Sequence, residues 1–235
     1  MDFETIKQVA WLGDDLAQAP IRGVILVFHG LNNTDMRKGP QPDEAQWAES
    51  GGLVVFPYYG PWSWMNRQAR AFVDELVTAV YAHFKLSADV PLISTGGSMG
   101  GHSALLYTRY AQHPVKACAA SYPVCDFKFH FSERPDLPRT IYDAFRGYAE
   151  PLEDLFTEHS ALSQVPNMPD IPYLIIHGTA DDLVNKARHS DRLVGAMRER
   201  GLKVEYLEVP GMGHGDPPAD IFQKNVDFVR SMLAR

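Results

Sequence analysis

One serine in this chain lies between glycines, in a pattern that serves nucleophilic catalysis. The stretch PLISTGGSMGG contains Gly96-x-Ser98-x-Gly100; an apolar strand pattern over 91–95 runs into it and a helical pattern follows it. At a sharp strand-to-helix turn, side chains two residues before and after the serine would collide with the strand or the helix. Such a turn presents the hydroxyl at its tip, in front of a helix N-terminus that favours negative charge. We therefore predict that Ser98 is a nucleophile.

The Gly-x-Ser-x-Gly pattern is weak on its own. In a chain with 18 glycines it arises by chance with a probability of about 0.07. A glycine-rich turn of this kind could also bind a phosphate. However, the sequence lacks both the lysine of a P-loop and the GxGxxG spacing. The position between a strand and a helix is what favours the catalytic interpretation.

A serine nucleophile needs a base, and the base needs a carboxylate to orient it. In a parallel α/β fold the expected chain order is serine, acid, histidine, each just after a strand. Asp181 follows the apolar run in IPYLIIHGTADDLV, and His214 lies in the glycine-rich loop of EVPGMGHGDPP. Asp182, next to Asp181, and Asp126, which also follows a strand, are alternatives for the acid.

Among the nine histidines, only His214 combines glycine neighbours with the required place in the chain order. We expect His102 to pack or to cap the helix after the serine, and His177 to form a structural hydrogen bond. The others considered lie on helix faces or in loops: His83, His113, His130, His159 and His189. No group of ligand residues has the clustered spacing of a metal site, so we expect neither a metal nor a cofactor.

The oxyanion of an acyl-transfer reaction is stabilised by two backbone amides. One donor is expected on the residue after the nucleophile, Met99. The other is expected in the loop after an earlier strand, where GVILVFHGLNN ends. Leu31 is the predicted donor in that loop, and Asn32 is the second choice.

Strand and helix patterns alternate along the chain. Apolar runs bounded by turns predict strands at 24–28, 53–56, 92–95, 115–122, 173–176 and 204–209. Helices are predicted at 66–85, 100–113, 185–200 and from 217 to the C-terminus. Such alternation favours right-handed crossovers and a mostly parallel sheet.

The segment 126–171 is too long for a simple crossover. It contains helical patterns at 139–148 and 151–159 and is predicted to form a small helical cap over the sheet. The first twenty residues are expected to add a short strand or two at one edge. No repeat or linker divides the sequence, so residues 1–235 are predicted to form a single domain that includes this cap.

Aromatic residues follow the strand pattern at 53–56. The loop PYYGPWSWMN places Tyr59, Trp62, Trp64 and Met65 beyond a strand end, where ligands bind in parallel sheets. These side chains could equally pack only the loop. In DFKFHF, Phe127 could cover a substrate pocket, or the alternation could mark one packed face.

Composition narrows the class of protein. A net charge of −7, an isoelectric point near 5.7 and the lack of basic runs argue against a nucleic-acid surface. We find no signal-peptide pattern and no apolar run of the roughly 18–20 residues needed to span a bilayer. Cys118 and Cys125 are seven residues apart, and neither a disulfide nor a zinc site is expected. A cytoplasmic protein without a membrane partner is the expectation.

The ordered motifs resemble a known family. From PYLIIHGTADDLV to GMGHG the chain resembles the catalytic domain of the prolyl oligopeptidase and dienelactone hydrolase branch of the α/β-hydrolase superfamily. That branch carries its acid in HGxxDxxV and its histidine in GxGHG, which match Asp181 and His214. The turn GGSMGG is similar to the serine elbows of that branch and of small carboxylesterases. Over residues 20–235 the resemblance implies an α/β-hydrolase fold.

Two departures from the family pattern refine the expected activity. Prolyl oligopeptidases carry an N-terminal propeller that this sequence lacks, and dienelactone hydrolases use a cysteine where this chain has Ser98. Both favour a serine esterase acting on a small soluble ester, with Ser98, Asp181 and His214 as its catalytic residues. The alternatives are a peptidase or amidase acting on short peptides, a hydrolase-fold protein that only binds a ligand, and acyl transfer to an acceptor other than water.

Overall fold

A seven-stranded, mostly parallel sheet runs through the residues that the computed structural model describes, 1–17 and 20–233. Its strands lie in the order β1-β3-β2-β4-β5-β6-β7. The bounds are Ala10–Leu12 for β1, Gly23–Phe28 for β2, Gly52–Pro57 for β3, Leu92–Gly97 for β4, Val115–Ser121 for β5, Tyr173–Gly178 for β6 and Val204–Val209 for β7. Only the pairing of β1 with β3 is antiparallel among these strands. The predicted α/β-hydrolase fold is confirmed.

Ten α-helices are found in the described residues. They are α1 (Phe3–Val9), α2 (Pro42–Glu49), α3 (Arg67–His83), α4 (Met99–Tyr110), α5 (Phe127–Glu133), α6 (Leu137–Ala144), α7 (Leu152–Glu158), α8 (Ala161–Gln164), α9 (Ser190–Glu199) and α10 (Ala219–Ser231). A short 3₁₀ turn, Val165–Asn167, follows α8. No helix of the described chain has the length and apolar character needed to cross a membrane.

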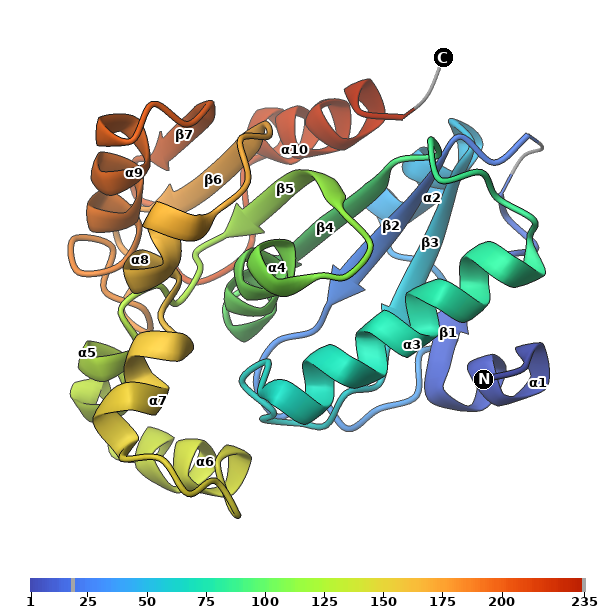
Figure 1. Cartoon of the computed structure of the whole chain (residues 1–235). Helices are drawn as coiled ribbons and strands as arrows, with labels where there is room; N and C mark the ends of the chain where they lie inside the picture. The colour runs from blue at the N-terminus through green and yellow to red at the C-terminus, as the bar shows by residue number, and fades with distance from the viewer. Residues whose placement is uncertain (18–19, 234–235) are drawn as a thin grey trace.

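The helices cover the two faces of the sheet and form two hydrophobic cores. Buried residues of α3, α4 and α9 pack on one face, and those of α2 and α10 pack on the other. The central strands are buried on both faces, which explains their continuous apolar runs. Figure 1 shows α5, α6 and α7 beyond the ends toward which the parallel strands point. These helices belong to the segment 126–171, which we call the cap.

Several boundaries differ from the sequence predictions. The first twenty residues form α1 before the single edge strand β1, and α2 was not predicted at all. The helix predicted at 185–200 begins only at Ser190, because a turn occupies the preceding residues. The stretch DFKFHF forms the N-cap and the first residues of the helix α5, so its alternating phenylalanines do not all lie on one face. The last helix ends at Ser231, and the predicted extension over 234–235 lies outside the described residues.

Candidate active site

Ser98 lies at the junction of β4 and α4 in a strained backbone conformation. Its φ of 59° and ψ of −124° lie in a region that residues with a side chain rarely occupy. The Ser98 N–H donates to the carbonyl of Ser121 at 3.0 Å, which ties the turn to the end of β5. Strain of this kind persists only where surrounding contacts enforce it, and it is concentrated at functional sites.

The glycines around Ser98 are required by close backbone approach. A Cβ on Gly96 would lie 2.6 Å from the carbonyl carbon and oxygen of Gly100. A Cβ on Gly100 would lie 2.1 Å from the carbonyl oxygen of Phe28 at the end of β2. The first turn of α4 therefore packs directly against the neighbouring strand, and no larger residue fits at either position.

Asp181 and His214 form a hydrogen-bonded pair. His214 Nδ1 lies 2.8 Å from Asp181 Oδ2. The other carboxylate oxygen accepts the backbone N–H groups of Leu183 at 3.0 Å and Val184 at 2.9 Å. The Asp181 side chain is fully buried, whereas His214 is 14% exposed. The loop after β6 thus holds the carboxylate still and leaves the imidazole accessible.

Burial by itself would raise the pKa of Asp181. Hydrogen bonds from His177, His214 and the Val184 amide outweigh that effect and hold the pKa well below its usual value. The carboxylate is therefore ionised near neutral pH and accepts a hydrogen from His214 Nδ1. His214 Nε2 then carries a lone pair that can take a proton.

His177 supports the carboxylate from behind. Its Nε2 lies 3.1 Å from Asp181 Oδ2 and 3.1 Å from the carbonyl oxygen of Val184. A carbonyl only accepts hydrogen bonds, so Nε2 carries the hydrogen, and Nδ1 accepts the hydroxyl of Ser190 at 2.6 Å. The structural hydrogen bond expected for His177 is present. The sequence did not indicate that His177 also contacts Asp181.

Ser98 and His214 line one cavity of about 520 Å³. Leu31, Trp64 and Tyr122 also line it, together with residues of the cap, and we call it the Ser98 cavity. Within the described residues, no hydrogen bond joins the Ser98 hydroxyl to His214. Such contacts often shorten only when substrate binds. The Tyr122 ring meets the His214 ring edge-on, with centroids 4.6 Å apart, and was not singled out by the sequence.

The two amides predicted to bind an oxyanion are both placed near this cavity. Met99 is the first residue of α4, where a helical N–H has no intrahelical acceptor. Leu31 lines the cavity, and among the described residues its N–H has no hydrogen-bond acceptor. The second choice, Asn32, donates its N–H to the carbonyl of Pro61 at 2.7 Å and is therefore committed elsewhere.

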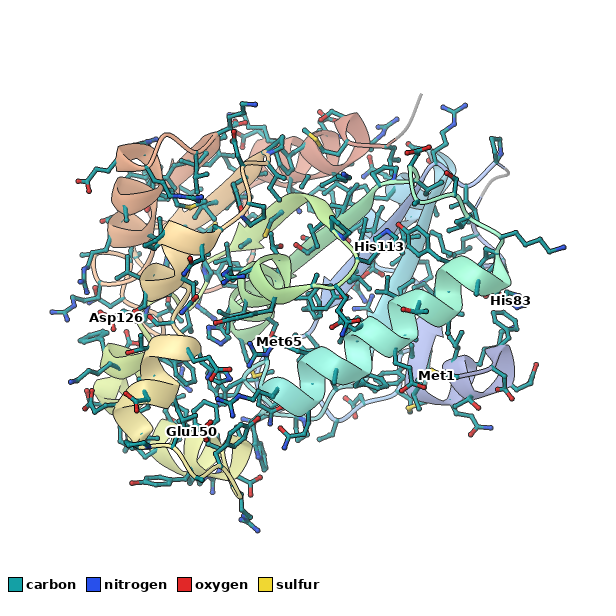
Figure 2. All side chains as sticks on the ribbon, viewed as in Figure 1. Met1, Met65, His83, His113, Asp126 and Glu150 are labelled. Atoms are coloured by element: carbon teal, nitrogen blue, oxygen red, sulfur yellow. The ribbon has the colours of Figure 1, made fainter. Side chains whose placement is uncertain are left out.

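The alternative acids lie apart from His214. Asp126 caps α5 by accepting the N–H of Phe129 at 3.1 Å, and it pairs with Arg192. Figure 2 shows Asp126 near the junction of the sheet and the cap. Asp182 is exposed and contacts neither histidine of the Asp181 group.

Only one of the five residues predicted to line a substrate pocket does so. All but Trp62 are buried in one core, and of these only Trp64 lines the Ser98 cavity, whereas Tyr59, Met65 and Phe127 do not. Tyr59 donates its hydroxyl to the carbonyl of His29, and Trp62 donates to Asp143 of the cap. The aromatic loop packs inward against α4 and the cap, which agrees with the alternative that Tyr59, Trp62 and Met65 pack the loop. Phe127 lies on α5 and packs against Trp64 and His102.

The cap brings a second histidine–carboxylate group to the cavity. His130, which lines the cavity, has its Nδ1 2.7 Å from Glu133 Oε2, and His189 Nε2 lies 3.0 Å from the same oxygen. His189 Nδ1 accepts the backbone N–H groups of Cys125 and Asp126. His189 Nε2 therefore carries a hydrogen and donates it to Glu133, which does not fit a metal ligand. Sequence spacing did not reveal this cluster, because its members come from two distant helical segments.

Comparison with known proteins identifies the family. The model of the prolyl oligopeptidase family matches residues 73–234, which is more than half of the chain. This chain belongs to the prolyl oligopeptidase family. The matched region contains Ser98, Asp181 and His214, but not the loop that carries Leu31.

Relatives of this family member include esterases and peptidases. S-formylglutathione hydrolase of Rattus norvegicus is 25% identical over 178 residues, which cover 74% of this chain and 60% of the relative. Acylaminoacyl peptidase of Pyrococcus horikoshii superposes with a TM-score of 0.79 at 14% identity, over 96% of this chain and 39% of that one. A truncated carbohydrate esterase from gut microbiota gives a TM-score of 0.71 at 18% identity, over 95% and 89%. The chain thus spans about 60% of the curated relative and less than half of the peptidase.

Proposed function

We propose that this member of the prolyl oligopeptidase family is a serine esterase that cleaves a small carboxylic ester through an acyl-enzyme. The observation that carries the proposal is the hydrogen bond between Asp181 and His214, whose imidazole lines the same cavity as the strained Ser98. A hydroxyl at an elbow, a histidine with a free Nε2 and a buried ionised carboxylate are the three parts of a serine hydrolase site. We further propose that residues 1–235 act as one domain, with segment 126–171 as its cap.

In the proposed mechanism, the Ser98 hydroxyl attacks the ester carbonyl while His214 Nε2 takes its proton. Asp181 keeps the hydrogen on His214 Nδ1 and stabilises the imidazolium that forms. The amides of Leu31 and Met99 bind the oxyanion of the tetrahedral intermediate. His214 then gives its proton to the departing alcohol. Water repeats the sequence on the acyl-enzyme and releases the acid.

Ester cleavage is supported by the names of two of the similar proteins. One solved structure with the same fold is a carbohydrate esterase. The curated relative is a hydrolase of S-formylglutathione. Cleavage of short peptides is the second candidate, because the family as a whole carries the name of a peptidase.

The test is hydrolysis of 4-nitrophenyl acetate by the wild type and by Ser98→Ala. We expect a loss of about 10⁶-fold in kcat, since that is the typical effect of removing the nucleophile of a triad. Ser132→Ala changes an exposed cap serine and serves as the matched control. Activity that survives in Ser98→Ala would exclude Ser98 as nucleophile. A wild type without any esterase or peptidase activity would favour a ligand-binding protein.

A paired comparison then separates ester from amide cleavage. The wild type is given an acyl 4-nitrophenyl ester and the 4-nitroanilide of the same acyl group. An esterase cleaves the ester alone at an enzymatic rate, while a peptidase cleaves both. Adding an alcohol and analysing the products detects acyl transfer to an acceptor other than water.

A further inference from the structure

The charged side chains that line the Ser98 cavity have one sign. The protein as a whole is acidic, with a net charge of −7. Among its described residues, however, those that line the cavity include Arg37 and Arg134 and no aspartate or glutamate. Carboxylates near the cavity have partners: Glu44 is paired with Arg37, Asp136 with Arg134, Asp181 with His214 and His177, and Glu133 with His130 and His189. Two arginines and no carboxylate in the lining indicate a ligand of negative charge.

Arg37 is held firmly in the loop between β2 and α2. One of its terminal nitrogens, Nη1, pairs with Glu44, whose side chain is only 2% exposed. The guanidinium lies over the Phe56 ring, 3.8 Å from the centroid, and the backbone N–H of Arg37 donates to the Tyr58 hydroxyl at 2.7 Å. The side chain itself is 15% exposed. A guanidinium that is already ordered loses little entropy when a ligand binds.

One edge of this guanidinium remains available. Nε and Nη2 of Arg37 have no hydrogen-bond partner among the described residues, and neither nitrogen is sealed from solvent. Glu44 does not need them, because its second oxygen accepts the N–H of Gln41 at 2.8 Å. The Nε and Nη2 hydrogens point in parallel, a spacing that matches the two oxygens of a carboxylate.

Arg134 contributes a second positive charge from the cap. Its Nε and Nη2 bind the two carboxylate oxygens of Asp136 at 3.1 and 2.8 Å, which leaves Nη1 free. His29 and His130 add no fixed charge near neutral pH, because burial lowers the pKa of both. The attraction for an anion therefore comes from the two arginines, and chiefly from Arg37.

We propose that the substrate of this site carries a carboxylate, bound by the free edge of Arg37 and attracted in addition by Arg134. This inference rests on the proposed esterase function and specifies its substrate class. The carboxylate can belong to the acyl part or to the alcohol part of the ester. Both placements bring an anion into the same cavity as Ser98.

The first test needs only the wild type and two matched pairs of esters. For the acyl side, the 4-nitrophenyl monoester of glutarate is compared with 4-nitrophenyl hexanoate. For the alcohol side, 4-acetoxybenzoate is compared with 4-acetoxybenzamide. Spontaneous hydrolysis is subtracted with Ser98→Ala. We expect kcat/KM to favour the anionic member of at least one pair by about tenfold, as one charge-assisted contact allows.

Salt provides an independent readout. The preference for the anionic ester should shrink as ionic strength rises, because salt screens the attraction between partly exposed charges. Neutral esters hydrolysed as fast as anionic ones in both pairs would overturn the proposal. Such a result leaves the esterase function intact, provided that hydrolysis still depends on Ser98.

Variants then assign the preference to the arginines. Arg37→Gln alone leaves Glu44 buried without its partner, so it is combined with Glu44→Gln, which replaces the ion pair by two amides. The matched control is Arg139→Gln, which removes one charge from an exposed position of the cap outside the cavity. Folding of each variant is checked by urea unfolding.

The ratio of kcat/KM for the anionic ester to that for its neutral partner decides the outcome. The double variant should lose about tenfold in this ratio, and Arg134→Gln a smaller factor, while Arg139→Gln keeps the ratio of the wild type. Glu44→Gln alone retains the guanidinium and should keep or increase the ratio. An unchanged ratio in a folded Arg37→Gln/Glu44→Gln variant would contradict the assignment.

Discussion

Two histidine–carboxylate groups face the Ser98 cavity, and they are built in the same way. In each, the carboxylate is bonded to two histidines and to the loop 183–185, which donates two backbone N–H groups to Asp181 and one to Glu133. Asp181 is held by His214 and His177, while Glu133 is held by His130 and His189. The difference between them lies in what surrounds the imidazole that reaches the cavity.

His214 lies in a glycine-flanked loop after β7 and is 14% exposed, beside the strands whose ends carry Ser98 and Asp181. His130 lies on α5, is 2% exposed, and has its carboxylate three residues later on the same helix. Glu133 also accepts the N–H of Asn185 and thereby joins the cap to the loop after β6. In the proposed mechanism the first pair serves catalysis, whereas the second attaches the cap to the loop after β6. We therefore propose that position relative to the elbow, and not the pair itself, sets the role.

The two groups should differ most in kcat when the imidazole that reaches the cavity is removed. His214→Ala should lower kcat for 4-nitrophenyl acetate by about 10⁶-fold, since loss of the base is nearly as severe as loss of the nucleophile. His130→Ala should lower it by no more than about tenfold, because His130 takes no part in the proposed proton transfers. Steady-state kinetics on both purified variants measure this. Equal losses would contradict the distinction between the two groups.

Removing the charge of Asp181 should give the next largest loss of kcat. Asp181→Asn should cost about 10⁴-fold in kcat, because the amide no longer holds the hydrogen on His214 Nδ1. Asp182→Asn, at the adjacent exposed position, is the control and should leave kcat within about twofold. If Asp182→Asn were the damaging change, the acid would have been assigned to the wrong residue.

Replacing the second histidine of each group should again lower kcat more for the Asp181 group than for the Glu133 group, but by a smaller factor. His177→Gln removes one charge-assisted hydrogen bond to Asp181, and we expect kcat to fall on the order of tenfold. His189→Gln should reduce stability with little change in kcat. The kcat of each variant is compared with its urea midpoint. A loss of kcat in His189→Gln that matches the loss in His177→Gln would show that the cap group also acts in catalysis.

The stability of the cap group should depend on pH. Burial tends to raise the pKa of Glu133, but hydrogen bonds from His130, His189 and the Asn185 amide lower it well below its ordinary value of 4.5. A carboxyl with a depressed folded pKa stabilises the protein fully above its unfolded pKa, and this stabilisation is lost as the pH falls toward the folded value. Near pH 7, Glu133→Gln should therefore unfold at a lower urea concentration than the wild type. Its free energy of unfolding should be lower by about 1–3 kcal/mol.

The difference in free energy of unfolding between Glu133→Gln and the wild type should narrow below a pH of about 4.5, because the carboxyl of the unfolded chain then takes up its proton. Both proteins also lose stability below pH 6.5, because burial lowers the pKa of His102 to about 3 and of His159 to about 4 while the unfolded histidines protonate at 6.5. Only the difference between the two proteins reports on Glu133. A gap that stays constant down to a pH of about 4 would contradict its ionised state.

Local patterns were sufficient for the fold and for the proposed catalytic residues. Ser98 and Asp181 each follow a buried strand, visible as an apolar run bounded by turns, and His214 follows the partly exposed edge strand β7. The elbow glycines are also a local signal, because the backbone of Gly100 approaches β2 too closely for any side chain. Short elements such as α1 and α2 were missed because their few polar and apolar residues form no periodic pattern.

The sequence alone thus predicted a mostly parallel sheet and placed Ser98, Asp181 and His214 just after three of its strands, since each of these features depends on residues close together in the chain. The three-dimensional packing was needed to show that Trp64 lines the cavity and Met65 does not, that Glu133 contacts His189 and that Arg37 keeps one edge free. These features depend on how loops pack and on contacts between residues far apart in the chain, such as Glu133 and His189, which are 56 positions apart. The local spacing of residues therefore does not predict them.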